Sequence, residues 1–161
     1  MTKNEFKTLF DGHFDSVRSY IYYRCGDTDL ATDIAQDVFL RIWEKQIHID
    51  KTRPVSLLFK IARDMFVSSF RRKKVEMNFI NNLERDPQEG SPEEKLEYKE
   101  LEGRYNKALA DLPEKQRIVF LMSRIENLKY YEIAERLGIS VKAVEKRMKN
   151  ALSFVRISIQ E

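Results

Sequence analysis

The sequence feature that most restricts the fold is a short break between two helical patterns near the carboxyl end. Residues 130–152 read YYEIAERLGISVKAVEKRMKNAL, and the apolar residues of IAERL recur at the spacing of a short amphipathic helix. Gly138 suits the left-handed conformation just past a helix end, because it has no β-carbon. Ser140 suits the cap of the next helix, because its hydroxyl accepts a hydrogen bond from an unpaired backbone N–H. The sequence therefore predicts two helices joined by a tight turn.

The second of these helices is predicted to have two chemically different faces. Its apolar residues share one face and are Val144, Met148, Ala151, Leu152 and Val155. Its other face carries Lys142, Lys146, Lys149 and Asn150, with Arg147 at the edge. A helix, a turn with Gly and a basic second helix together indicate a helix-turn-helix that binds DNA. The alternative is a helical hairpin whose charged face is simply solvated, and this segment alone leaves it open.

The distribution of charge is more informative than the net charge of +3. Residues 51–74 hold 8 basic and 1 acidic side chains, and residues 129–156 hold 7 and 3. Between these two basic segments, residues 75–102 hold 3 basic and 9 acidic side chains. Two basic segments separated by an acidic one indicate two contacts on a polyanion joined by a spacer.

Composition predicts an all-α protein and excludes several functional classes. Gly 5 and Pro 4 are low counts for 161 residues, and charged residues make up 34%. Cys25 is the single cysteine, so we expect no internal disulfide, no cysteine zinc site and a reducing, cytoplasmic setting. We expect no membrane span and no secretory signal, since no apolar run is long enough to cross a bilayer. Nothing in the sequence calls for a cofactor.

The periodicity predicts two small helical domains joined by a flexible linker. The first, residues 1–75, contains helices over about 5–24, 28–46 and 55–74. Residues 76–94 have little apolar periodicity and carry the turn signals DP and GSP, so we predict a linker there. The second domain, residues 95–161, contains about four short helices, of which one begins at Pro113.

Three segments in this order resemble a known family. They are DLATDIAQDVFLRIWEK (29–45), PVSLLFKIARDMFVSSFRRKK (54–74) and LADLPEKQRIVFLMSRIENLKYYEIAERLGISVKAVEKRMKNAL (109–152). Together they resemble bacterial RNA polymerase sigma factors of the extracytoplasmic-function type, within the sigma-70 family. The resemblance covers nearly the whole chain apart from the linker, and it implies a subunit that directs core RNA polymerase to specific promoters and helps melt them.

The resemblance implies that the second helix docks on the largest polymerase subunit. The residues that lie mostly off its apolar stripe are Asp33, Gln36, Asp37, Leu40, Arg41 and Glu44. An exposed Leu40 among charged residues is typical of an apolar anchor with a polar rim. The alternative is that Asp33 and Asp37 are ordinary solvated carboxylates, and no matching His or third acid indicates a metal site.

The basic segment 51–74 resembles the part that recognises and melts the minus-ten element. Melting requires cations for the exposed strand and a pocket or platform for an unstacked base. We expect the base to enter at the loop 48–53, and we expect Phe59, Phe66 and Phe70 to be core residues. The residues expected to supply the charge are Lys51, Arg53, Lys60, Arg63, Arg71, Arg72, Lys73 and Lys74. The chain departs from the family pattern at two positions, with Leu57 for a Trp and Asp64 for an Asn.

The helix-turn-helix resembles the domain that reads the minus-thirty-five element. The residues expected to face DNA are Tyr130, Lys142, Lys146, Arg147, Lys149 and Asn150. Lys to guanine and Asn to adenine are favourable pairings in the major groove. The resemblance also implies an anti-sigma partner, often membrane-anchored, that covers the same surfaces and holds the factor inactive.

Two other functions compete with this interpretation. A stand-alone transcriptional regulator would use the helix-turn-helix without polymerase, but it leaves residues 29–74 without a specific role. An enzyme acting on nucleic acid needs a metal or an activated nucleophile. His13, His48 and Cys25 lie in different predicted elements, so we expect no enzymatic activity.

Overall fold

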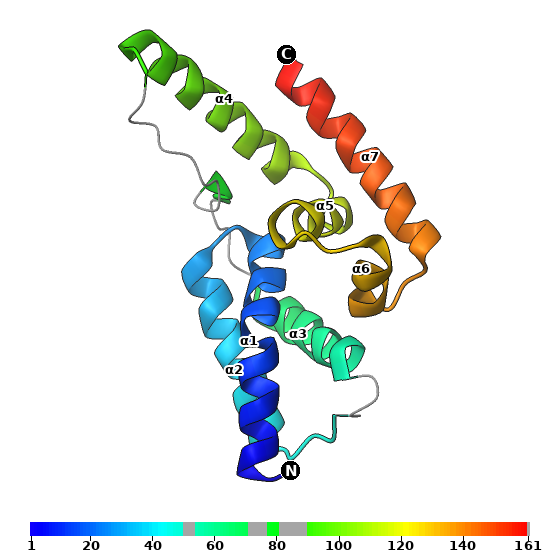
Figure 1. Cartoon of the computed structure of the whole chain (residues 1–161). Helices are drawn as coiled ribbons and strands as arrows, with labels where there is room; N and C mark the ends of the chain where they lie inside the picture. The colour runs from blue at the N-terminus through cyan, green and yellow to red at the C-terminus, as the bar shows by residue number, and fades with distance from the viewer. Residues whose placement is uncertain (50–53, 71–76, 81–89, 161) are drawn as a thin grey trace.

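The protein is described by a computed structural model that covers residues 1–49, 54–70, 77–80 and 90–160. In these ranges the chain is all-α, as predicted, with no strand and seven helices (Figure 1). The helices are α1 Lys3–Cys25, α2 Thr28–Glu44, α3 Pro54–Phe70, α4 Pro92–Asp111, α5 Glu114–Glu126, α6 Tyr130–Leu137 and α7 Val141–Gln160.

Local sequence signals explain where several helices begin and end. Thr2 and Ser91 each form a capping box with the Glu three residues later, at the starts of α1 and α4. The side chain of Asp27 accepts a hydrogen bond from the backbone N–H of Leu30 at 3.0 Å and so caps α2, as predicted. The predicted first position for Pro113 is shifted by one residue, since Pro113 is the residue before α5.

Helices α1, α2 and α3 form a first unit around an aromatic cluster. Phe39 of α2 is 1% exposed and lies with its ring 5.2 Å from that of Phe10 and 5.8 Å from that of Phe14, both on α1. Phe59 and Phe66 of α3 are also buried, so the prediction that they are core residues is confirmed. The side chain of Phe70 lies outside the described part of the chain.

Helices α4 to α7 form a second unit in which α5 is central. Helix α5 packs against α6 and α7, and α7 also packs against α4. Helix α5 has a run of six consecutive buried residues, which includes Ile118, Val119, Leu121 and Met122. Away from α5, the outer ends of α4 and α7 diverge (Figure 1).

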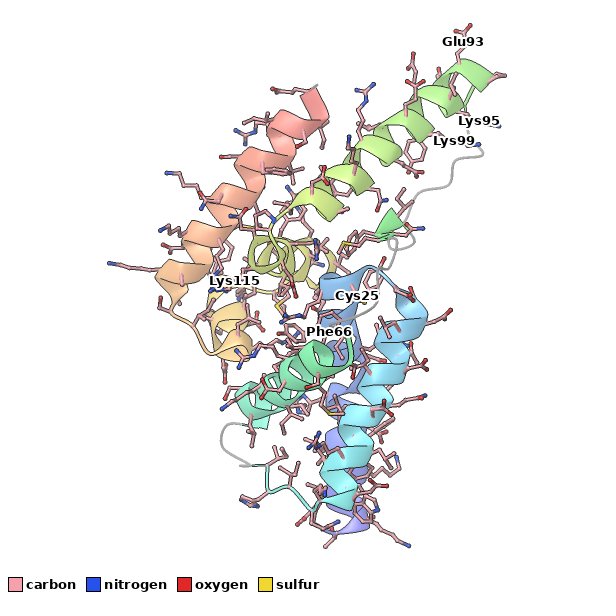
Figure 2. The ribbon with its side chains drawn as sticks, turned by 180° about the vertical axis from the view of Figure 1, so that it is seen from behind. Cys25, Phe66, Glu93, Lys95, Lys99 and Lys115 are labelled. Atoms are coloured by element: carbon pink, nitrogen blue, oxygen red, sulfur yellow. The ribbon has the colours of Figure 1, made fainter. Side chains whose placement is uncertain are left out.

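The two units pack directly against each other, which the sequence analysis did not predict. The contacts run between α1 and α5 and between α3 and α6. Figure 2 shows Cys25, at the end of α1, near this junction, whereas Glu93, Lys95 and Lys99 lie at the far end of α4.

The segment that joins the units differs in two ways from the predicted flexible linker 76–94. Helix α4 begins at Pro92, because Ser91 supplies its cap. Phe79, within the predicted linker, is 2% exposed and belongs to the core. The segment is anchored by one buried aromatic side chain. A single apolar residue produces no periodic pattern in the sequence, so periodicity did not indicate this anchor.

Candidate nucleic-acid interface

The tight turn between α6 and α7 has the predicted geometry. Gly138 adopts φ 65° and ψ 36°, the left-handed region, and its backbone N–H donates to the carbonyl of Ala134. The Ser140 hydroxyl accepts a hydrogen bond from the backbone N–H of Ala143 at 3.1 Å and caps α7. Ile139 is half-buried against the core between the two helices. The turn therefore fixes α7 relative to α6.

Helix α7 is divided into the two predicted faces. The apolar side chains Val144, Met148, Ala151 and Val155 are buried and Leu152 is half-buried. The predicted DNA-facing residues Lys142, Lys146, Lys149 and Asn150 are all exposed, Arg147 is half-buried, and Tyr130 at the start of α6 is exposed. No described carboxylate forms a salt bridge with any of the three lysines. Their charges are therefore available to an anion in solvent.

The described part of the predicted minus-ten surface lies on α3. Lys60 and Arg63 are exposed, and Arg63 is 3.5 Å from the carboxylate of Asp64. That pair is a consequence of the departure from the family pattern, because an Asn would offer no charge to Arg63. Leu57, the other departure, is half-buried. The remaining predicted residues lie outside the described ranges, namely Lys51, Arg53, Arg71, Arg72, Lys73 and Lys74.

A cavity of about 350 Å³ brings the α3 surface together with the helix-turn-helix. Lys60 and Arg63 line it from α3, and Arg136 and Gly138 line it from the other unit. The structure thus places two residues predicted for the minus-ten element beside the turn predicted for the minus-thirty-five element.

A further exposed surface lies on α2. Leu40 is 52% exposed on it. The residues around it that were predicted to contact polymerase are also exposed, namely Asp33, Gln36, Asp37, Arg41 and Glu44. This face therefore has the predicted form of an apolar anchor with a charged rim.

The sequence analysis missed Arg117, which is only 2% exposed. Its guanidinium donates to the carbonyls of Tyr23 and Arg24 at the end of α1, at 2.7 and 2.8 Å. It also donates to the carbonyl of Leu109, at the end of α4, at 3.2 Å. Burial lowers the pKa of Arg117 from its ordinary value. One sequence signal could have indicated this burial. Arg117 lies four residues before the apolar Leu121, so helical spacing places it on the apolar face of α5.

A second arginine, the half-buried Arg136 of α6, also connects the two units. It is 3.5 Å from the hydroxyl of Ser16 and lies over the ring of Phe59, both in the first unit, and it pairs with Glu126 of its own unit at 3.0 Å. The hydroxyl of Tyr23 donates to the same Glu126 carboxylate at 3.1 Å. Burial, followed by the charge of this carboxylate, raises the pKa of Tyr23. The contact between the units is therefore rich in charged and polar groups.

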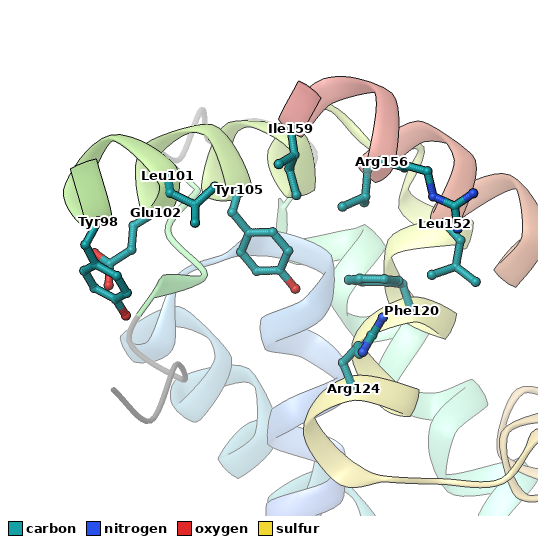
Figure 3. A pocket seen from close by; sticks show the side chains of 10 residues that line it. Tyr98, Leu101, Glu102, Tyr105, Phe120, Arg124, Leu152, Arg156 and Ile159 are labelled. Carbon is teal, nitrogen blue, oxygen red and sulfur yellow. The ribbon is translucent and has the colours of Figure 1, made fainter. Parts of the chain in front are cut away.

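An apolar groove lies between the diverging parts of α4 and α7 (Figure 3). Its volume is about 510 Å³. The ring of Tyr105 and the side chain of Leu101 reach into it from α4, Leu152 and Ile159 line it from α7, and Phe120 lies between them. A groove of this size and character suits the apolar face of a partner helix.

The described residues contain no arrangement typical of a metal site or an activated nucleophile. No group of three or more His, Cys, Asp or Glu side chains in these ranges has metal-binding geometry. Burial raises the pKa of the Cys25 thiol to about 11, so the thiol is protonated at neutral pH. None of the helices in the described part of the chain has both the length and the apolar character that crossing a bilayer requires.

Comparison with known proteins gives matches to both units. The family model "Sigma-70 region 2" matches residues 9–75, and "Sigma-70, region 4" matches residues 103–155. The ferric citrate uptake sigma factor FecI of Escherichia coli is 33% identical, with 91% of this chain and 86% of FecI covered. The ECF RNA polymerase sigma factor SigW of Bacillus subtilis is 26% identical, with 99% of this chain and 91% of SigW covered.

Solved structures support the same fold. CnrH in complex with the cytosolic domain of CnrY has a TM-score of 0.64 at 21% identity and covers 99% of this chain and 90% of its own. The sigma factor RpoE in complex with the anti-sigma factor NepR, from Bartonella quintana, has a TM-score of 0.61 at 20% identity and covers 97% of each chain. Both likenesses extend over both helical units.

Proposed function

The chain belongs to the sigma-70 family and is a sigma-type transcription initiation factor, and from this we propose which of its surfaces contact polymerase and promoter. The face of α2 around Leu40 binds RNA polymerase core, α3 contributes to the minus-ten element, and α7 reads the minus-thirty-five element. The proposed domains are 1–75 and 95–161, extended to Pro92 by the helix cap. The matched ranges 9–75 and 103–155 support these boundaries.

The single observation that carries the DNA-binding proposal is the division of α7. Its buried face holds the helix rigidly against α4, α5 and α6, and its exposed face offers three lysines and an amide. A helix presented in this way after a tight turn fits the major groove. Lys142, Lys146, Lys149 and Asn150 are proposed to face the bases, and Tyr130 and Arg147 are proposed to hold phosphate.

The proposal for α3 rests on charge and on exposure. Lys60 and Arg63 are exposed to solvent on α3. Further basic residues precede and follow this helix in the sequence. Lys51 and Arg53 precede α3, and Arg71, Arg72, Lys73 and Lys74 follow it. These cations would hold the displaced strand while promoter DNA is melted.

We further propose that an anti-sigma factor binds this chain in the cytoplasm. Both similar solved structures are complexes, one of CnrH with the cytosolic domain of CnrY and one of RpoE with the anti-sigma factor NepR, which supports a partner of this kind. The apolar groove between α4 and α7 and the Leu40 face are the surfaces offered to such a partner. We propose no covalent chemistry by the chain itself.

The test combines transcription in vitro with a competition assay for core polymerase. Lys146→Glu should abolish promoter-specific initiation while core binding is retained, because it reverses a charge on the DNA face only. For each cation that no longer meets a phosphate, the salt dependence of promoter binding should also become flatter by about one unit of slope. Lys115→Glu reverses an exposed charge on α5, outside both surfaces, and should leave initiation intact.

Leu40→Asp should have the opposite pattern, with loss of core binding. Leu96→Asp is its matched control, because Leu96 is 59% exposed on α4 and Leu40 is 52% exposed on α2. If Leu40→Asp competes for core as well as the control does, the assignment of the polymerase surface is wrong. If the chain binds its promoter tightly but never binds core, it acts as a stand-alone regulator.

A further inference from the structure

Residues 77–80, between the two units in sequence, bind to the end of α1. The backbone N–H of Asn78 donates to the carbonyl of Gly26 at 2.9 Å. The hydroxyl of Tyr22 donates to the carbonyl of Asn78 at 2.7 Å. Burial raises the pKa of Tyr22 to about 12, so this hydroxyl keeps its proton over the whole physiological range. The segment is therefore attached to the first unit by two hydrogen bonds.

The same four residues bind to the second unit. The side-chain oxygen of Asn106, on α4, accepts from the backbone N–H of Phe79 at 2.8 Å. The side-chain nitrogen of Asn106 donates to the carbonyl of Met77 at 3.3 Å. One amide side chain thus satisfies a donor and an acceptor of an otherwise irregular backbone. The connection is held from both sides at once.

The ring of Phe79 fills the space between the units. It lies 5.5 Å from the ring of Tyr22 on α1, in an edge-to-face arrangement. Its face is 5.2 Å from the guanidinium carbon of Arg117 on α5. Because the ring is 2% exposed, moving the units apart would expose most of it to water.

Arg117 completes the contact by binding two helix ends that belong to different units. The carbonyl groups at a helix C-terminus carry partial negative charge, so a buried cation between two such ends is favourable. Two of these bonds, to Tyr23 and Arg24, cross the contact between the units. The bonds to Leu109, Ala110 and Leu112 stay within the second unit. Arg117 would therefore keep partners if the units separated.

Gly26 is required by the same contact. Its φ of 66° ends α1, and a β-carbon there would lie 2.8 Å from the Cα of Met77. A side chain at this position would both strain the backbone and displace residues 77–80. The backbone at Met77 thus lies so close to Gly26 that no room remains for a side chain there.

In this closed arrangement the two proposed DNA surfaces lie too close together to read both promoter elements. Lys60 and Gly138 line one cavity, and four residues, or at most about 14 Å of chain, lead from Gly138 to Lys142. The positions that name the minus-ten and minus-thirty-five elements place them about 25 base pairs apart, or about 85 Å along B-form DNA. The units must therefore separate before both elements are bound.

We propose that residues 77–80 and Arg117 form an intramolecular latch that holds the two promoter-binding units closed, and that the latch opens when the factor engages polymerase and promoter. The part of this inference that concerns opening on polymerase and promoter rests on the proposed function. The latch itself is a property of the free chain. Its components are Tyr22 and Gly26 on the first unit, Met77, Asn78 and Phe79 in the connection, and Asn106 and Arg117 on the second unit.

The test measures the distance between the units in the full-length chain. Spin labels are placed at Asp29→Cys on α2 and Lys99→Cys on α4, two exposed positions on different units, while the native Cys25 is buried. Free wild-type chain should give one short, narrow distance distribution. Phe79→Ala should raise the fraction at long distances by about tenfold or more, as expected when a buried aromatic anchor is truncated.

Two further variants keep the test decisive. Tyr22→Phe removes only the hydroxyl that binds Asn78 and should raise the long-distance fraction by roughly two- to tenfold. Leu96→Ala truncates an exposed apolar side chain outside the latch and should change nothing. Circular dichroism checks that helix content is unchanged in each variant.

The outcomes separate the latch from the proposed function. A broad wild-type distribution, or a Phe79→Ala distribution identical to that of wild type, overturns the latch. Added core polymerase with promoter DNA should move the wild-type distribution to long distances. If polymerase binds and the short distance persists, opening on engagement is wrong. If polymerase does not bind at all, the proposed function is wrong, and the free-chain result still decides the latch.

Discussion

The packing inside each unit and the packing between the units use different chemistry. Inside the first unit, Phe6, Phe10 and Phe14 of α1 surround Phe39 of α2, and Arg18 lies over the Phe14 ring at 5.9 Å. Between the units, Arg117 binds backbone carbonyls at the end of α1, and Arg136 lies over the ring of Phe59 and 3.5 Å from the hydroxyl of Ser16. Arg24 of α1 also pairs with Glu114 of α5 at 2.5 Å, across the same contact.

This difference indicates which contacts are permanent. Separating apolar surfaces exposes area that water cannot satisfy, so a mainly apolar core opens only when the unit unfolds. Polar groups that separate can bind water instead, so a contact that combines such groups with one buried ring, that of Phe79, opens at lower cost than a wholly apolar contact. Contacts between domains of one chain generally resemble transient protein interfaces in this respect. The closed arrangement is thus suited to a protein whose two parts have to come apart.

The largest effect is expected from the core of the first unit. Phe39→Ala should lower the free energy of unfolding by about 3–5 kcal/mol, because it removes a ring that is 1% exposed. Chemical denaturation followed by circular dichroism measures this change. The neighbouring Leu40→Ala is the control and should cost less than about 0.5 kcal/mol, since Leu40 is exposed. Similar losses for the two variants would show that the aromatic cluster is not the core that holds the unit.

A smaller effect, of a different kind, is expected at the contact between the units. Arg136→Gln removes the cation that lies over the Phe59 ring and beside Ser16 of the first unit, and it should shift the equilibrium toward the open arrangement by about 0.5–2 kcal/mol. The distance distribution between the labelled units measures it. Helix content should stay the same, because the side chains involved hold the units together and do not fill either core.

The matched control for Arg136→Gln is an exposed ion pair. Lys7 and Asp11 are 2.6 Å apart, but their side chains are 74% and 57% exposed, against 18% for each partner of the Arg136 pair. Lys7→Gln should therefore leave both stability and distance unchanged. If Lys7→Gln has an effect as large as that of Arg136→Gln, solvent exposure does not determine how much these ion pairs contribute to stability.

The smallest effect is expected from pH. Burial, together with the charge of Arg136, lowers the pKa of His13 from its ordinary 6.5. The unfolded chain therefore takes up this proton first as the pH falls. His13 costs no stability above pH 6.5, and the cost grows as the pH drops below it. A plot of unfolding free energy from pH 7.5 to 5.5 measures the loss.

Two variants identify His13 as the source of that loss. His13→Gln should reduce the slope of the plot, because it removes the titrating group. Arg136→Gln should also reduce it, but by less, since burial is the larger cause of the shift. An unchanged slope in His13→Gln would assign the pH dependence to other groups.

Much of the second unit was predictable because its signals are local. Gly138 and Ser140 specify the turn through their own backbone and side-chain chemistry, and Val144 and Met148 specify the buried face of α7 through spacing alone. The exposure of Leu40 on α2 followed from periodicity in the same way. The roles of Lys146 and Leu40 in binding stay predictions until the variants are measured.

The contact between the units was not predictable, because its groups come from distant parts of the sequence. Arg117 lies 94 residues from Tyr23, whose carbonyl it binds, and Arg136 lies 120 residues from Ser16. Phe79 appeared as one aromatic residue in a polar segment, and nothing near it in sequence predicts that it is buried. An arginine in a helix is usually exposed, so the composition of α5 favoured the wrong environment for Arg117.

The sequence by itself determined the seven helices of the described ranges, the turn at Gly138 and the separation of charged from apolar faces. These features depend on hydrogen bonds and spacings within a few residues, which any one segment carries. Only the tertiary structure decided that Phe79 and Arg117 join the two units and that Lys60 lies near the helix-turn-helix. Such contacts depend on the shapes of two folded surfaces. Every residue has a backbone carbonyl, so the residue types at the end of α1 do not indicate which side chain binds the carbonyls there.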